Sequence, residues 1–472
     1  MPLVVGVDSS TSACKVQVRD ADTGAVVATG RAAHSPTSPP RSEQPPSEWE
    51  AAFHTACAQA ALPARQTPVA IAVAAQQHGL VVLGHDGAVL RPAKLWNDTE
   101  SAPDTGSLLA ALPGGQAGWA EACGSVPVPS FTITKLHWLR RCEPETFRRT
   151  VAVLLPHDWL TFRLTGRRTT DRGDASGTGY WSPREERYRE DLLRLVSEDV
   201  DWDAALPEVL APNAVAGEWR GAGIPVAAGT GDNMAAALGL GLRPGDLALS
   251  LGTSGTAFTV SDEAAADPTG TVAGFADATG RYLPLVCTMN ATKVTDAMAR
   301  LLGVDHARFD ALALEAPAGA GGLVMVPHLD GERTPNRPGA TGQLTGLRTD
   351  VTPGQLARAA VEGVVCNLLA GADALGETAR GTVFLVGGAA HSRVYRRVVA
   401  DLTGRAVRVP ADDELVAAGA AVQAAALHHG GDFAEVADAW GLGRGDTVEP
   451  DDTVDRLAIR AAYADAVAGA LR

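Results

Sequence analysis

The chain opens with short apolar runs that are separated by polar and glycine-rich turns. This pattern predicts an antiparallel meander of three strands, Val4–Val7, Lys15–Val18 and Ala25–Thr29. The next segment predicts a helix over Ser47–Leu62, in which Ser47 is the N-cap and Glu50 completes a capping box. A continuous apolar run then predicts a buried strand over Val69–Ala74. Strands mixed with helices in this way indicate an α/β domain.

A second α/β pattern follows in the later half of the chain. Residues 100–220 are largely helical and loop-like, and indicate an insertion over the first sheet. The segment Leu240–Gly245 is a Gly- and Pro-containing link. We therefore expect an N-terminal domain over residues 1–240 and a C-terminal domain over residues 241–472. Later elements are predicted as strand Thr382–Val386, helix Ser392–Thr403, strand Ala406–Val409 and helix Glu414–Leu427.

Composition narrows the class of protein. A length of 472 residues exceeds what one hydrophobic core supports, and 46% hydrophobic with 20% charged residues is typical of a globular enzyme or binding protein. The net charge of −15 argues against a nucleic-acid or anionic-membrane partner. No apolar run approaches the ~20 residues that span a bilayer, no signal-peptide pattern occurs, and the six cysteines include no C-x-x-C pair. A cytoplasmic protein with reduced thiols is expected.

Two similar turns of hydroxyl and glycine residues each follow a predicted strand, at Gly6–Ser12 and Leu249–Thr256. Such turns are common, but they also place backbone N–H groups around an anion such as phosphate. One turn in each half suggests a duplicated fold that binds a polyphosphate from both sides. The carboxylate of Asp8 would repel phosphate unless a metal lies between them, and Mg²⁺ prefers one or two carboxylates plus phosphate oxygens. Lys15 either adds a cation to this site or is an exposed strand lysine.

Further polar segments lie where predicted strands or hairpins end. In Gly229–Asn233, Asp232 is either the N-cap of a helix or a general base for a hydroxyl nucleophile. Gln76–Gly79 follows a buried strand, at the edge of an α/β sheet where ligands bind. Trp96–Asp98 is a polar cluster whose simplest interpretation is an Asx-turn. Gly387–Ala389 either admits a flat ring against the backbone or is an ordinary strand-to-helix turn.

Together these segments resemble the FGGY family of carbohydrate kinases, and within it the xylulokinases. The resemblance runs through nearly the whole chain in order, at Gly6–Ser12, Gln77–Gly79, Leu95–Asp98, Gly231–Asn233, Leu251–Gly255, Gly331–Pro335, Gly346–Leu347, Ala360–Gly363 and Gly387–Ala389. It implies two actin-like, ribonuclease-H-type α/β domains around a central cleft, which closes about the link at Leu240–Gly245.

The resemblance also implies a role for each matching residue. Asp232 would be the catalytic base, and Asp8 would lie near Mg²⁺ and hold it through water. The sugar would contact Gln77, His78, Trp96, Asp98, Asp232 and Asn233. ATP would contact Thr11, Ser12, Lys15, Thr253, Ser254, Gly387, Gly388, Ala389 and Ser392. The implied reaction is ATP-dependent phosphorylation of a terminal hydroxyl of a small-molecule ketose.

Three departures from the family pattern bear on the choice of sugar. Gln77 stands where Met is usual, and Thr230 stands where Gly is usual. Thr99–Glu100 stands where Gly-Arg commonly follows the Trp-Asn-Asp motif. The first expected reaction is D-xylulose to D-xylulose 5-phosphate, and the alternatives are ribulose, another pentulose or hexulose, or a polyol. An actin-like ATPase switch and an inactive sugar sensor are the rival functions from other classes. A homodimer is common in such kinases, and no segment of the sequence indicates an interface.

Overall fold

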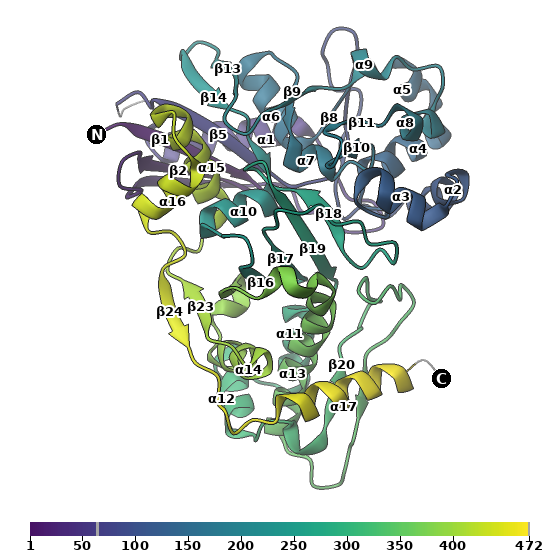
Figure 1. Ribbon diagram of the computed structural model, residues 1–472, viewed down its shortest axis with the longest axis vertical. Helices are drawn as coiled ribbons and strands as arrows, with labels where there is room; N and C mark the ends of the chain where they lie inside the picture. Colours follow the sequence, from purple (N-terminus) through teal and green to yellow (C-terminus); the bar gives the residue numbers. More distant parts are fainter. Residues whose placement is uncertain (63–65, 471–472) are drawn as a thin grey trace. The chain divides into compact units, whose positions relative to one another are not determined.

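The computed structural model describes residues 1–62 and 66–470 of the chain (Figure 1). The chain forms two compact units. Unit 1 comprises Met1–Leu242, Ser261–Leu283 and Glu414–Leu442, and unit 2 comprises Arg243–Val260, Pro284–Asp413 and Gly443–Arg472. Each unit contains a mixed β-sheet with helices, which confirms the expected two-domain α/β class. The domain boundary at 240/241 stays a prediction.

The sheet of unit 1 has the strand order β13-β14-β5-β1-β2-β3, and β15 pairs with β5. Its strands are β1 (Leu3–Ser9), β2 (Ala13–Asp20), β3 (Val26–Ala33), β5 (Ala70–Ala75), β13 (Val215–Trp219), β14 (Ile224–Ala227) and β15 (Thr230–Gly231). Strand β1 runs antiparallel to β2 and parallel to β5, and β2 runs antiparallel to β3. The predicted opening meander is therefore confirmed.

Helices α1 (Pro46–Gln59) and α15 (Leu415–His429) pack on the sheet of unit 1, α1 against β2 and β3, and α15 against β1 and β5. Strand β1 is buried along its whole length. A Cβ on Gly6 would lie only 2.0 Å from the carbonyl oxygen of Ala417 in α15. Glycine at this position therefore lets α15 approach the strand that carries the first turn.

The start of α1 differs from its prediction. Pro45 is the N-cap, and no side chain caps the helix. The predicted capping box of Ser47 and Glu50 is wrong because the helix already begins at Pro46, where a proline ring fits the first turn and its missing N–H costs nothing. Glu50 instead accepts a hydrogen bond from Arg163 Nε at 3.0 Å.

Residues 100–205 are largely helical and have their own core around Trp119, Leu139 and Trp202. The predicted insertion over residues 100–220 extends too far, because Val215–Trp219 is strand β13 of the main sheet. The remaining helices of unit 1 are α2 (Ala102–Ala111), α3 (Gly115–Cys123), α4 (Thr132–Cys142), α5 (Pro144–Arg149), α6 (Pro156–Thr165), α7 (Arg172–Ser176), α8 (Glu190–Val196), α9 (Trp202–Ala205), α10 (Asp232–Leu240) and α16 (Phe433–Trp440). Its short strands are β4 (Glu43–Gln44), β6 (Val81–Leu83), β7 (Ala93–Lys94), β8 (Ala152–Leu154), β9 (Thr169–Asp171), β10 (Trp181–Ser182), β11 (Arg187–Tyr188), β12 (Glu208–Leu210) and β18 (Ala273–Ala276).

Unit 2 repeats the theme of a strand, a tight turn and an antiparallel strand. Its sheet has the order β19-β17-β16-β22-β23-β24, with β16 parallel to β22. The strands are β16 (Leu247–Leu251), β17 (Gly255–Thr259), β19 (Tyr282–Thr288), β22 (Val383–Val386), β23 (Val407–Pro410) and β24 (Gly445–Val448), beside the pair β20 (Val324–Val326) and β21 (Gln343–Thr345). The helices are α11 (Thr292–Leu302), α12 (His306–Glu315), α13 (Pro353–Ala372), α14 (Arg393–Thr403) and α17 (Arg456–Gly469), with short 3₁₀ turns η2 (Ala320–Gly322), η3 (Asp373–Ala379) and η4 (Gly388–His391).

One apolar segment, Pro353–Gly376, is long and apolar enough to cross a membrane by length and composition. Its most apolar window is 78% buried inside the protein, which is typical of a core helix in a soluble domain. All six cysteines are free, in line with the expected reduced thiols.

Candidate functional site

The first predicted phosphate turn follows β1, and its carboxylate is buried. Asp8 is 2% exposed and lies opposite Lys15 in the β1–β2 ladder. Ser10 Oγ donates a hydrogen bond to Asp8 Oδ1, and Lys15 Nζ lies 3.6 Å from Asp8 Oδ2. Burial raises the pKa of Asp8, and the charge of Lys15 opposes that shift. The turn therefore holds a buried carboxylate whose negative charge is partly balanced by the cation of Lys15.

Lys15 has a second partner that the sequence did not indicate. Its Nζ lies 2.5 Å from Glu414 Oε2, which comes from the segment just before α15. Burial alone would lower the pKa of Lys15, but the charges of Asp8 and Glu414 outweigh it and raise that pKa. Lys15 is thus fixed between two carboxylates, which disfavours the alternative of an unengaged strand lysine. No local pattern links residues 399 positions apart.

Thr11 connects the first turn to two other predicted site segments. Its Oγ1 donates to Gln76 Oε1 at 3.2 Å and accepts from Trp96 Nε1 at 2.9 Å. Trp96 is 36% exposed, so part of its indole remains available to a ligand. The neighbouring Ser12 is exposed, and its carbonyl oxygen accepts from the backbone N–H of His34 at 2.9 Å.

Gln77, Asp232 and Asn233 lie together. Asn233 Nδ2 donates to Gln77 Oε1 at 2.8 Å and to Asp232 Oδ1 at 3.0 Å. Gln77 is 3% exposed, and its Nε2 has no hydrogen-bond partner among the residues that the structure describes. A buried amide donor without a partner is costly, so this group is a candidate to bind a ligand oxygen.

Asp232 is the first residue of α10, and its Oδ1 also accepts from the backbone N–H of Asn233 at 2.9 Å. Gly231 is the N-cap and no side chain caps this helix, so the alternative that Asp232 is an N-cap is wrong. The carboxylate keeps some exposed surface but lies deep among protein atoms. Burial, followed by the negative charges of Asp8 and Asp174, raises the pKa of Asp232 to about 7. A carboxylate that titrates near neutral pH is suited to general-base catalysis.

His78 follows the same strand end as Gln77 and has a left-handed backbone conformation, with φ of 65°. Its Nδ1 lies 2.7 Å from the carbonyl oxygen of Gly177, and its ring stacks on Phe131 with centroids 4.9 Å apart. A non-glycine residue in this conformation is strained, and such strain is often found at functional sites. The surrounding contacts hold the imidazole in one orientation.

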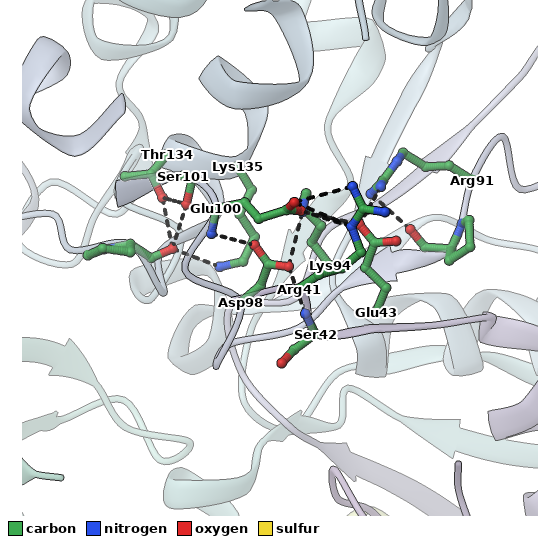
Figure 2. A network of polar contacts seen from close by, with 12 residues as sticks. Arg41, Ser42, Glu43, Arg91, Lys94, Asp98, Glu100, Ser101, Thr134 and Lys135 are labelled. Atoms are coloured by element: carbon green, nitrogen blue, oxygen red, sulfur yellow. Dashed lines mark hydrogen bonds and ion pairs between the residues drawn. The ribbon is translucent and has the colours of Figure 1, made fainter. Parts of the chain in front are cut away.

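Asp98 is completely buried, unlike its neighbour Trp96. Its Oδ2 accepts from the backbone N–H of Ser42 at 2.9 Å and from Lys94 Nζ at 3.0 Å, and its Oδ1 accepts from the backbone N–H of Glu100 at 3.1 Å (Figure 2). The last of these bonds is the Asx-type turn that the sequence suggested. With these partners, Asp98 supports the Trp96 loop, and its predicted contact with sugar stays a prediction.

Asp98 belongs to a charge network that we call the Lys94 cluster, made up of Arg41, Glu43, Arg91, Lys94, Asp98 and Glu100 (Figure 2). Lys94 is 0% exposed and lies 3.1 Å from Glu43 Oε1 and 2.5 Å from Glu100 Oε2. Its Nζ also lies 3.8 Å from the ring centroid of Trp138. Glu100, one of the departures from the family pattern, is therefore paired with a buried lysine.

The second predicted phosphate turn lies in unit 2 between β16 and β17. The backbone N–H of Gly252 donates to Ser254 O at 3.0 Å, and the backbone N–H of Ala291 donates to Thr253 O at 3.1 Å. Thr253 is exposed and Ser254 is half-buried. The start of α11 thus holds the turn in place while its hydroxyl residues remain accessible.

The predicted adenosine loop starts after β22. Gly387 has φ of 84°, and a Cβ there would lie 2.8 Å from Leu251 O, so only glycine fits beside β16. A Cβ on Gly388 would meet no atom within 4 Å, so space is open above this residue. Ala389 is buried, at 3% exposed. Ser392 caps α14 and donates to Asp310 Oδ1 at 2.9 Å, so its hydroxyl already has protein partners.

The donor set at Asp8 fits Mg²⁺. Asp8 is not part of a cluster of three or more ligand side chains among the described residues. Mg²⁺ usually keeps several waters and binds one or two carboxylates plus substrate phosphates, so a single buried carboxylate beside a phosphate turn is sufficient.

Comparisons with known proteins agree with this geometry and define the class as carbohydrate kinase. Models of the FGGY family of carbohydrate kinases match residues 3–239 with the N-terminal domain and residues 247–428 with the C-terminal domain. The chain therefore belongs to the FGGY family of carbohydrate kinases, and the resemblance found in the sequence is confirmed.

The similar relatives include xylulose kinase from Streptomyces rubiginosus, 50% identical over 97% of this chain and 95% of the relative, and xylulose kinase from Escherichia coli, 36% identical over 85% of each chain. The crystal structure of xylulose kinase from Bifidobacterium adolescentis is 40% identical, covers 99% of both chains and superposes with a TM-score of 0.86.

Proposed function

We propose that this carbohydrate kinase transfers the γ-phosphate of ATP to the terminal hydroxyl of D-xylulose and yields D-xylulose 5-phosphate. The names of the relatives, xylulose kinase at 50% and 36% identity, support this substrate. The observation that carries the proposal is Asp232, a carboxylate with a pKa of about 7 beside the unpartnered amide of Gln77.

In this proposal, unit 1 binds the sugar. Gln77 Nε2 donates to a sugar hydroxyl, and Asn233 holds both Gln77 and Asp232 in fixed orientations. His78 and the indole of Trp96 supply further sides of the pocket. Because Gln77 offers an amide donor where the family usually has an apolar Met, the sugar hydroxyl that it meets contributes to specificity.

The chemistry then depends on position and charge. Asp232 accepts the proton of the attacking hydroxyl, a role that is worth ~10²–10⁴-fold in general-base catalysis. Phosphoryl transfer passes through a loose transition state whose negative charge lies on the phosphoryl oxygens. In this proposal, Lys15 and the backbone N–H groups of the turn after β1 stabilise that charge. Mg²⁺, when bound near Asp8 through water, neutralises charge on the phosphates.

Unit 2 binds the nucleotide in this proposal. The turn with Thr253 and Ser254 contacts phosphate, and Gly387, Gly388 and Ala389 contact the adenosine. The open space above Gly388 supports this assignment. We propose that Ser392 acts there through the helix that it caps. We also propose a cytoplasmic location, and a homodimer stays a prediction that light scattering after size exclusion can test.

The test is ADP release with Mg-ATP against D-xylulose, D-ribulose, other ketoses and polyols. We expect D-xylulose to give the highest kcat/KM, and Asp232→Asn to lose turnover by about 10²–10⁴-fold while it still binds sugar. Asp203→Asn, an exposed aspartate in α9, is the matched control and should keep full turnover.

The other outcomes each reject one part of the proposal. Turnover on another sugar alone would reject D-xylulose and keep the mechanism. ATP hydrolysis that no sugar changes would favour the ATPase switch. Near-normal turnover of Asp232→Asn would reject this residue as the base.

A further inference from the structure

A second group of titratable residues packs against the segment Gly229–Asp232 and has no role in the proposed mechanism. We call it the His157 cluster: His157, Asp158, Asp171 and Asp174. None of the four is more than 2% exposed. His157 Nδ1 lies 2.7 Å from Asp174 Oδ2 and 3.3 Å from Asp158 Oδ1, and its Nε2 lies 3.9 Å from Asp171 Oδ1.

The His157 cluster contains three carboxylates and one imidazole. Among the described residues, His157 is the sole basic partner of these carboxylates. Within the part of the chain that the structure describes, Asp158 Oδ1, Asp174 Oδ1 and His157 Nε2 have no hydrogen-bond partner. Asp158 and Asp171 also accept backbone N–H bonds, from Leu155 and from Gly173 and Asp174. Buried charge is costly without compensation, so the remaining negative charge of the cluster favours a protonated His157. Burial alone would lower the pKa of His157, but Asp158 and the hydrogen bond to Asp174 raise it to about 9.

The cluster is joined to the segment that carries Asp232. Thr230 Oγ1 donates to Asp171 Oδ2 at 2.7 Å, and Thr230 precedes Asp232 by two residues. Gly229 packs on the imidazole, because a Cβ there would lie 2.9 Å from His157 Cδ2. The cluster is therefore in direct contact with the segment that holds Asp232.

We propose that His157 is a positioning residue for catalysis: its imidazolium compensates the buried carboxylates behind Gly229–Asp232 and so keeps Asp232 in place and ionised near neutral pH. This inference rests on the proposed role of Asp232 as the base. It assigns a function to the departure at Thr230, whose hydroxyl links the catalytic segment to the cluster.

The charged groups around Asp232 determine the expected sign. Asp8 from β1 and Asp174 from α7 both raise the pKa of Asp232. Arg172, also on α7, is directed to Glu186 and Asp277 at 2.8 and 3.6 Å and does not pair with the cluster. Burial and the nearby negative charges of Asp158 and Asp174 raise the pKa of Tyr180, so its phenol stays neutral. Loss of the imidazolium therefore makes the potential at Asp232 more negative.

The experiment compares His157→Gln with His157→Lys. A base must be ionised, so kcat/KM for the sugar rises with pH through the pKa of Asp232. In His157→Gln we expect this acid limb to move to higher pH by about one unit, since a compensating charge is gone. His157→Lys keeps the charge and should leave the limb where it is in the parent protein. Asp174→Asn removes a negative charge and should move the limb to lower pH.

If His157 only packed against its neighbours, the Gln and Lys variants would lose activity at every pH. The acid limb would then stay at the same pH in both variants. That result, or an unchanged limb in His157→Gln, overturns the inference. If His157→Gln does not fold, Asp174→Asn still tests the inference, because its acid limb should move to lower pH. Near-normal turnover of Asp232→Asn would instead reject the proposed base.

A second readout does not depend on activity. Histidine-selective ¹⁵N NMR of the whole protein, with His157 assigned from the spectrum of His157→Lys, should show a protonated imidazole through pH 8. Titration of His157 near pH 6.5, the ordinary value for histidine, would overturn the inference.

Discussion

Two clusters of buried charge in unit 1 differ in how that charge is balanced. In the Lys94 cluster, three carboxylates meet three cations, and Glu143 pairs with Arg91 at its edge. In the His157 cluster, three carboxylates share one imidazole. The balanced cluster supports the Trp96 loop, whereas the unbalanced cluster lies behind Asp232.

If Asp232 is the base, as we propose, one domain separates structural support from catalysis. Paired charges act as a rigid anchor, although they add little net stability over apolar packing. Unbalanced charges raise the pKa of neighbouring carboxyls and so cost stability, and such shifts are common at sites of acid–base chemistry. The central groups of the two clusters, Lys94 and His157, are both fully buried, so net charge, and not burial alone, distinguishes the clusters.

The largest expected effect comes from Asp232, which shares the excess negative charge near the His157 cluster. Asp232→Asn should lose turnover by about 10²–10⁴-fold and gain thermal stability, because it removes a carboxyl whose ionised form is disfavoured. We expect a gain of roughly 1 kcal/mol, since the group keeps some solvent contact. Differential scanning fluorimetry at pH 8 checks this. A lower melting temperature would contradict the view that catalytic charge is held at a cost.

The next effect breaks the balanced cluster. Lys94→Met keeps much of the side-chain volume but leaves Asp98 and Glu100 without their buried cation, so it should cost about 3–5 kcal/mol in the free energy of unfolding. Urea denaturation measures the loss. Adding Glu100→Gln to Lys94→Met should recover part of it, because one uncompensated charge is removed. A loss of stability no larger than that from replacing an exposed lysine would show that the Lys94 cluster does not anchor the Trp96 loop.

Much of the fold could be predicted because its signals are local. The β1–β2–β3 meander, the later strands and helices, and the two glycine- and hydroxyl-rich turns are encoded in short stretches. Their order along the chain was sufficient to indicate the family. The helix start at Pro46 was missed because a serine followed three residues later by a glutamate resembles a capping box, while the proline one residue earlier had already begun the helix.

The candidate site was predictable only as a set of residue types. The sequence placed Asp8, Gln77 and Asp232 at strand ends, but it did not indicate their partners. Glu414 meets Lys15 across 399 positions, and the His157 cluster assembles residues from α6, β9 and α7. Asp98 appeared equivalent to Trp96 in the sequence, yet the structure buries one and leaves the other partly exposed. These features depend on tertiary packing, which no local pattern reports.

A smaller effect is the dependence of stability on pH. The folded-state pKa values of Asp174 and Asp232, about 7, exceed the ordinary value of 3.8, so the native state binds more protons than the unfolded state between about pH 4 and 7. His157 acts in the same direction between its ordinary 6.5 and about 9. Stability should therefore fall by on the order of 1–3 kcal/mol from pH 5 to pH 8. Asp174→Asn should flatten this slope in urea titrations at the two pH values. An unchanged slope would show that the raised pKa of Asp174 does not cause the dependence of stability on pH.

The smallest expected effect tests whether burial gives the Lys94 cluster its strength. The side chain of Arg41 is 67% exposed, and it pairs with Glu100 at 3.2 Å at the edge of the network. Exposed ion pairs are screened by water and restrict two long side chains, so Arg41→Ala should leave the melting temperature within experimental error. Measured beside Lys94→Met, it compares a rim cation with a buried cation that shares the same glutamate. If both variants lost the same stability, the charge count would matter without regard to burial.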